Sequence, residues 1–193
     1  MIKVSIQKSP RISQGDIYKD VEFIEGVTEI EGIIEVSKII FPRIIVLTQD
    51  CDLNYDSKFR CQTPEPEKHD KLLISVLVAP IYNVDHVYQG EHLSELGRIM
   101  NRIADMGSTR RTILENNKDP RYHYLEFPEN VPIPSSVIDF KHYFSVHVEY
   151  LNKIRESNFV CSISTLYRED VSQRFASFLS RIGLPELQQN EQL

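Results

Sequence analysis

The sequence has little that would direct it to a membrane or out of the cell. It contains no apolar run long enough to cross a bilayer and no charged, apolar, small-residue leader after Met1. Its three cysteines, Cys51, Cys61 and Cys161, are an odd number in a chain long enough to bury a sizeable core, so a disulfide scaffold is unnecessary. We therefore expect a soluble cytoplasmic protein with reduced thiols and no membrane association.

The common signatures of catalytic and cofactor sites are also missing. The chain has no nucleotide-binding glycine fingerprint, no P-loop, no His-Glu-x-x-His zinc motif and no nucleophile elbow. Its formal net charge of −6 gives no overall attraction to phosphate backbones. The sequence thus predicts no cofactor, and nucleic-acid binding would require a local basic surface.

The composition that remains is that of one globular domain. The chain has 193 residues, of which 41% are hydrophobic and 26% are charged. One compact core is the default for this length and apolar content. We predict a single domain over residues 1–185, followed by a frayed tail over residues 186–193.

Charge is distributed unevenly along the chain. Residues 96–125 carry six basic side chains against three acidic ones, whereas residues 1–70 carry nine basic against thirteen acidic. The basic segment includes Arg110 and Arg111, which makes it the candidate surface for RNA or a partner protein. An ordinary solvated surface of helices and loops explains the same charges.

Hydrophobic periodicity predicts a mixture of strands and helices. The run over residues 44–47 is apolar on both faces, which indicates a central strand. The stretch between residues 49 and 70 is polar and long enough to predict a functional or mobile loop. The predicted strands are 17–23, 33–36, 44–47, 72–79 ending at Pro80, and 137–148; the predicted helices are 93–103, a short one through Arg111 and Leu114, and one from Thr165 to Gly183 and Pro185.

One candidate site follows the predicted central strand directly. Asp50, Cys51 and Asp52 place two carboxylates and a thiol at a strand end, where sites often lie. The carboxylates disfavour the thiolate that a cysteine nucleophile needs. A metal could be held by Cys51 with Cys61, His69 or the aspartates, although the spacing matches no zinc pattern. A buried cysteine beside turn-capping aspartates is the structural alternative.

Two further candidates lie in the second half of the chain. His142 falls in the apolar stripe of the predicted strand 137–148, as either a site residue or a hydrogen-bonded core histidine. Arg121, Tyr122 and His123 combine a cation with rings that could grip phosphate and stack on a base. Ordinary strand composition explains this trio as well.

Four segments resemble the MazF/PemK toxin family. They are Gly15-Asp16-Ile17-Tyr18, Pro42-Arg43-Ile44-Ile45-Val46-Leu47-Thr48, Leu77-Val78-Ala79-Pro80-Ile81, and Val137-Ile138 before a terminal helix. The resemblance covers about a third of the chain and implies an SH3-like barrel. It also implies an endoribonuclease that acts on mRNA.

The positions that carry this family's chemistry differ here. Pro42-Arg43 reverses the family's Arg-Pro pair, and Tyr82 stands where a Thr or Ser is expected. Asp139 occupies the place of an arginine, and Lys141 that of an aspartate. An aspartate cannot stabilise the anionic transition state of phosphoryl transfer as an arginine does.

These observations together predict an α+β protein: an SH3-like β-barrel with inserted helices and a C-terminal helix. The leading functional hypothesis is a noncatalytic binding module of a bacterial toxin-like or phage-defence-associated protein. The alternatives are a divergent endoribonuclease of the MazF/PemK type and a metal-dependent enzyme that uses the Cys51 loop.

Overall fold

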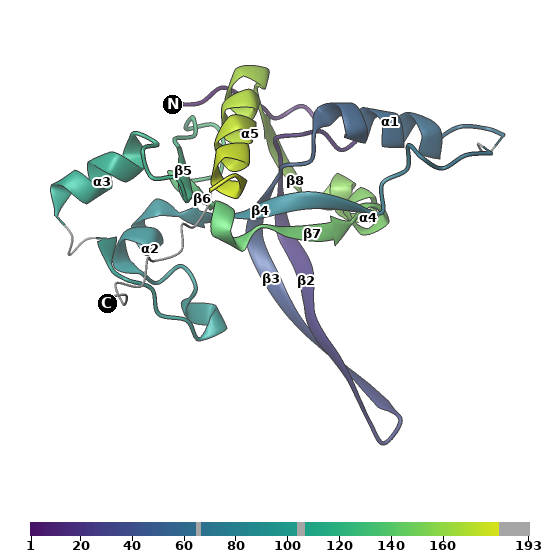
Figure 1. Ribbon diagram of the computed structural model, residues 1–193, viewed down its shortest axis with the longest axis horizontal. Helices are drawn as coiled ribbons and strands as arrows, with labels where there is room; N and C mark the ends of the chain where they lie inside the picture. Colours follow the sequence, from purple (N-terminus) through teal and green to yellow (C-terminus); the bar gives the residue numbers. More distant parts are fainter. Residues whose placement is uncertain (65–66, 104–106, 182–193) are drawn as a thin grey trace, which may run out of the picture.

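A curled antiparallel sheet forms the centre of the molecule (Figure 1). The computed structural model describes residues 1–64, 67–103 and 107–181. Across these ranges eight strands pair in the order β1-β8-β2-β3-β4-β6-β5, and β7 also pairs with β4. The strands are β1 (Val4–Ser5), β2 (Asp16–Ile30), β3 (Ile33–Val46), β4 (Ser75–Asn83), β5 (Tyr122–Leu125), β6 (Ser136–Asp139), β7 (Phe144–His147) and β8 (Phe159–Ile163). The predicted α+β class is confirmed, and the sheet has the shape of a half-barrel.

Helices cover both faces of this sheet. Ile17 and Ile45 belong to a core that includes Val171 and Phe175 of α5, while Tyr18 and Ile44, one residue away, belong to a second core with α1 and α4. This alternation follows the two-residue period of a strand. The helices are α1 (Asp50–Arg60), α2 (Val84–Gln89), α3 (Ser108–Glu115), α4 (Val148–Asn158) and α5 (Thr165–Leu179). None of the helices in the described ranges has the length and apolar content to cross a bilayer.

The predicted central strand is confirmed, and two proline boundaries are wrong. Ile44, Ile45 and Val46 are buried in β3 between β2 and β4. Pro42 lies inside β3, where the strand pairs with β2 alone, and Pro80 lies inside β4, where that strand's outer neighbour changes from β7 to β6. At both positions the ladder on one side is interrupted, so the missing N–H of proline is tolerated.

Two other assignments are also corrected by the structure. The predicted loop 49–70 contains α1, whose acidic first turn and basic last turn suit the helix dipole but whose apolar stripe is too short to be recognised. The predicted helix 93–103 is a single 3₁₀ turn at Ser94–Leu96 followed by irregular chain. Gly97 ends that turn at φ +66°, and Ile99 is 95% exposed, which breaks the expected apolar face.

The predicted strand 137–148 is two strands joined by a 3₁₀ turn at Phe140–His142. Its assigned inner face is largely buried, but Asp139, assigned to the outer face, is completely buried. The short helix through Arg111 and Leu114 is confirmed as α3, and the start of the last helix at Thr165 is confirmed as α5. The predicted helix end at Gly183 and Pro185 and the tail 186–193 lie outside the described residues.

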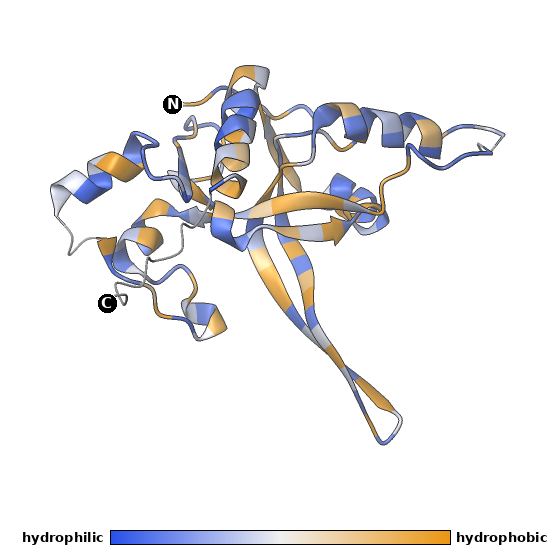
Figure 2. Ribbon diagram, viewed as in Figure 1, coloured by the Kyte–Doolittle hydropathy of each residue, from blue (hydrophilic) through white to orange (hydrophobic). Residues whose placement is uncertain are grey.

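The outer part of the β2–β3 hairpin projects from the body as a two-stranded arm (Figure 1). Beyond Phe41 the arm strands pair only with each other, over ladder positions from Glu22 with Ile40 to Ile30 with Ile33. Many of its side chains are apolar, as Figure 2 shows along the arm. The arm therefore exposes apolar surface that the body does not cover.

Candidate functional site

A hollow of about 370 Å³ lies at the base of the arm. Its walls are the arm base in β3, the end of β4, and the segment that follows α2. Rings and charged groups both line it, among them Phe41, Arg43, Tyr82, Glu91, His92 and Glu95. We call this hollow the arm-base pocket.

A glycine fixes the segment that forms the outer wall of the arm-base pocket. Gly90 ends α2 at φ +74°, a left-handed conformation that favours glycine, and its carbonyl accepts a hydrogen bond of 3.1 Å from Met100 N. A Cβ on Gly90 would lie 2.3 Å from the Met100 backbone oxygen. The close approach of these two backbones therefore holds residues 91–100 against α2.

Replacing Gly90 with alanine should disturb this wall. We expect Gly90→Ala to lower the free energy of unfolding by about 1–3 kcal/mol, because alanine adds a left-handed strain and a clash with backbone that cannot rotate away. Urea denaturation measures this loss. Gly32→Ala is the control, since Gly32 also has positive φ but a Cβ added there would meet no atom within 4 Å; an equal loss in both variants would show that the clash is unimportant.

A buried ion pair lies next to the arm-base pocket. Asp139 is completely buried and accepts hydrogen bonds from Arg121 Nε at 2.8 Å and Arg121 Nη2 at 2.5 Å. His142 Nδ1 lies 2.9 Å from the second carboxylate oxygen. Burial would raise the pKa of Asp139, but the bonds from Arg121 and His142 outweigh it and lower the pKa to about 2. The carboxylate is therefore ionised and held in one orientation.

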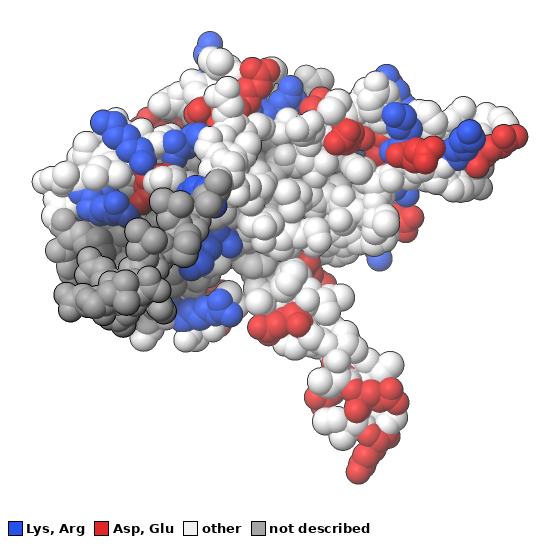
Figure 3. Space-filling model, in the orientation of Figure 1, with Lys and Arg blue, Asp and Glu red and all other residues white. Residues whose placement is uncertain are grey.

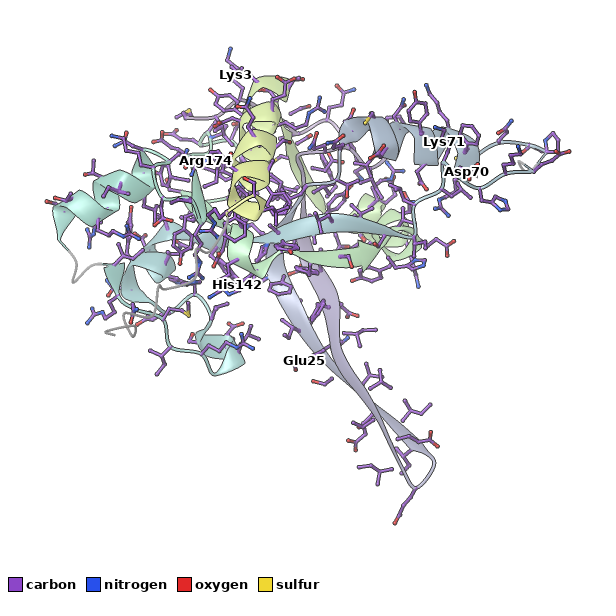
Figure 4. All side chains as sticks on the ribbon, viewed as in Figure 1. Lys3, Glu25, Asp70, Lys71, His142 and Arg174 are labelled. Carbon is purple, nitrogen blue, oxygen red and sulfur yellow. The ribbon has the colours of Figure 1, made fainter. Side chains whose placement is uncertain are left out.

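Two side chains in the pocket wall, Tyr82 and His92, carry buried polar atoms. In the described part of the chain the Tyr82 hydroxyl makes no hydrogen bond, and the nearest polar partner of the His92 ring is the His86 backbone. The two rings lie 5.0 Å apart, and the Tyr82 ring lies 6.4 Å from that of His142, near the base of the arm (Figure 4). Burial lowers the pKa of His92 to about 4 and raises that of Tyr82, so both side chains are neutral near pH 7.

This arrangement suits a neutral ligand with polar edges. Buried polar atoms in native proteins are nearly always paired, so unpaired atoms in a pocket wall point to a group that pairs with them. Arg43 is the lining cation, while Glu91 and Glu95 are lining carboxylates. The charges of the wall thus favour a neutral group over a phosphate.

Asp50, Cys51 and Asp52 lie on α1 and do not line the arm-base pocket. Asp50 begins α1 and pairs with Arg11 at 2.8 Å, and Arg168 lies 3.5 Å away. Burial raises the pKa of Asp50, but hydrogen bonds from Arg11 and Gln14 outweigh it and lower the pKa. Cys51 and Asp52 are exposed on the same helix. Over the described ranges, no group of three or more His, Cys, Asp or Glu side chains could hold a metal ion.

The trio of Arg121, Tyr122 and His123 does not form an exposed patch. Tyr122 and His123 are buried in β5, and the Arg121 guanidinium lies 4.7 Å from the Tyr122 ring while bonding to Asp139. Burial raises the pKa of Tyr122 to about 12. Burial and the nearby Arg174 lower the pKa of His123 to about 3.

Arg110 and Arg111 lie on α3, and neither lines the arm-base pocket. Arg110 pairs with Asp119 at 2.6 Å, and Arg111 lies over the Tyr88 ring at 4.9 Å. Lys and Arg side chains gather over the α2 and α3 side of the molecule, whereas the arm tip is acidic (Figure 3). The uneven charge seen along the sequence is therefore also a separation in space.

The predicted site residues do not meet in one cleft. In Figure 1, α1 with Asp50, Cys51 and Asp52 lies to the right of α5, whereas β5 with His123 lies to its left. The structure brings together Arg121 and His142, through Asp139. Sequence reasoning missed His92, because a lone histidine outside any motif carries no signal until the fold places it beside Tyr82.

The comparisons with known proteins add no name to this site. No protein-family model matches the chain, and the search of curated proteins finds no match.

Proposed function

We propose that this chain is a noncatalytic binding module built on an SH3-like barrel, of the kind associated with bacterial toxin or phage-defence loci. Its ligand site is the arm-base pocket, and its ligand is an unstacked base of single-stranded RNA. The observation that carries the proposal is the buried Tyr82 hydroxyl, which has no hydrogen-bond partner in the described chain and lies beside the His92 ring in the pocket wall.

The pocket has the features that RNA-binding proteins use for single bases. Such bases stack on aromatic rings and pair their edges with side-chain donors and acceptors. Phe41, Tyr82 and His92 supply rings, and the last two supply the polar atoms. Arg98 lines the adjoining groove between the arm and residues 95–98, where it could meet a flanking phosphate.

The absence of catalysis is proposed from the state of the charged groups. Arg121 donates hydrogen bonds from Nε and Nη2 to Asp139, so these two nitrogens are not available to a substrate phosphate. His123 is buried and neutral, so it cannot donate a proton to a leaving group near pH 7. Without a positioned cation or acid, phosphoryl transfer lacks its main stabilising interactions.

Binding of short single-stranded RNA tests the pocket. We expect Tyr82→Phe and His92→Phe each to weaken binding about 5- to 10-fold, because each removes a hydrogen bond worth about 1 kcal/mol and keeps the ring. Fluorescence anisotropy with a labelled oligonucleotide measures the affinity. Tyr55→Phe is the matched control, since Tyr55 lies on α1 outside the pocket lining. Unchanged affinity in both pocket variants would refute the proposed site.

One observation favours the endoribonuclease alternative. Asp139 lies 2.9 Å from His142 Nδ1, the spacing of a carboxylate and a general base in catalytic dyads. The same oligonucleotides therefore serve as cleavage substrates. Intact RNA after prolonged incubation supports the binding module; cleavage that His142→Ala abolishes, in a folded variant, would establish the nuclease instead.

A further inference from the structure

One face of the arm carries a continuous row of exposed aliphatic side chains. Opposed residues of an antiparallel pair project to the same face, and so do alternate residues of one strand. The ladder pairs Val27 with Val36, Glu29 with Ile34, Ile24 with Lys38 and Glu22 with Ile40. This face, which we call the arm stripe, therefore holds Ile24, Val27, Ile34, Val36 and Ile40, whose exposed fractions run from 49% to 67%.

The opposite face of the arm packs against the body near its base. Near the base it carries Phe23 and Phe41, which pack on Phe144 at centroid distances of 5.1 and 4.7 Å. Farther out it carries Thr28 opposite Glu35 and, at the tip, the exposed pair Ile30 and Ile33. The body thus covers the base of this face. On the arm stripe, Ile40 and Lys38 line the hollows beside residues 95–98, whereas Val27, Val36 and Ile34 lie farther out and line neither hollow. An isolated two-stranded hairpin is only marginally stable in water, so this surface gains stability from a cover.

The charges on the arm stripe are arranged to match a second copy of the same stripe. Lys38 lies toward the base, 2.6 Å from Glu22, and Glu29 lies toward the tip, with Val27 and Val36 between them. If two arms pack face to face and antiparallel about the valine pair, Glu29 of each copy reaches the level of Lys38 of the other. Glu35 lies on the far face, so it does not oppose the contact.

We propose that two copies of this chain associate through their arm stripes in a two-fold, antiparallel contact. Such a contact is isologous: the same patch is used on both copies, and it closes without leaving a free surface for a third. The valines form its centre, and the two Lys38–Glu29 pairs form its ends. The proposal does not depend on which ligand the arm-base pocket binds, although Ile40 belongs to the arm stripe and also lines that pocket.

Charge reversal tests the register of this contact. Sedimentation equilibrium of the full chain should show a monomer–dimer equilibrium. Glu29→Lys and Lys38→Glu should each weaken self-association at least tenfold, because like charges then meet at both ends of the contact. An equimolar mixture of the two variants should restore the dimer, because the heterodimer regains two opposite-charge pairs. A mixture that remains monomeric would overturn the antiparallel register.

A matched pair of substitutions tests the face. Val27→Lys places a charge at the centre of the arm stripe, whereas Thr28→Lys places the same charge on the opposite face, across from Glu35. We expect the first to give a folded monomer by circular dichroism and sedimentation, and the second to remain dimeric. A wild-type chain that stays monomeric up to millimolar concentration, or equal dissociation by both variants, would overturn the proposal. A monomer that binds zwitterionic vesicles through Val27 would assign the stripe to a lipid surface and overturn it too.

Discussion

Asp139→Asn is expected to lower the free energy of unfolding by about 3 kcal/mol, because it leaves a guanidinium without its counter-charge. Asp139 is completely buried, while the Arg121 side chain is 22% exposed, so water relieves part of the cost. The substitution also weakens the acceptor that faces Lys141 N at 3.0 Å and His142 Nδ1. Urea denaturation at pH 7 measures the loss.

A surface pair supplies the control for this experiment. Glu22 and Lys38 form an ion pair at 2.6 Å in which both side chains are more than 40% exposed. Glu22→Gln should change stability by less than about 1 kcal/mol, as exposed pairs usually do. If Asp139→Asn proved as mild as Glu22→Gln, the buried pair would not be a structural element of this site.

The second large effect is a loss of stability in acid. Burial lowers the pKa of His92 to about 4 and that of His123 to about 3, against about 6.5 in the unfolded chain. Below pH 6.5 the unfolded state therefore binds two protons that the folded state does not, and each costs up to about 1.4 kcal/mol per pH unit. Stability contributed by these neutral histidines is present above pH 6.5 and is lost as the pH falls.

Asp16 acts in the opposite direction over the same window. Burial raises its pKa to about 6, so the folded state takes up a proton between pH 6 and pH 4 that the unfolded state does not. This gain offsets one histidine. We therefore expect a net loss of about 1.4 kcal/mol per pH unit between pH 6 and pH 4. Stability curves from urea denaturation at several pH values measure the slope.

Two substitutions separate these contributions. His123→Phe should make the slope between pH 6 and pH 4 nearly flat, because His92 and Asp16 then cancel. Asp16→Asn should make the slope about twice as steep. An unaltered slope in His123→Phe would mean that this histidine titrates equally in both states.

Much of the sheet is predictable from sequence because burial on both faces leaves an apolar run. Residues 44–46 of β3 and the apolar part of β4 are recognisable for this reason. The boundaries at Pro42 and Pro80 are not, because the effect of a missing N–H depends on which neighbour lies beside the strand. Which strand lies beside each proline is decided by the tertiary structure, so no local sequence pattern predicts it.

The candidate site is predictable only in part. His142 and Arg121 stand out in the sequence, and the structure joins them through Asp139. Alternation assigns Asp139 to the outer face, whereas both faces of β6 are buried and the strand ends at Asp139 before the 3₁₀ turn. His92 and Tyr82 come from segments that only the fold brings together, so no local pattern reveals that they line one pocket.

The position of β8 has a consequence for how the sheet is completed during synthesis. β8 pairs with β2 on one side and with β1 on the other, so a segment near the end of the described chain fills the gap between the first two strands. A ribosome-bound chain that ends before residue 159 therefore exposes the edge of β2 at Asp16–Tyr18 and leaves β1 without a neighbour. Such late, long-range closure slows folding and favours pairing with other nascent chains.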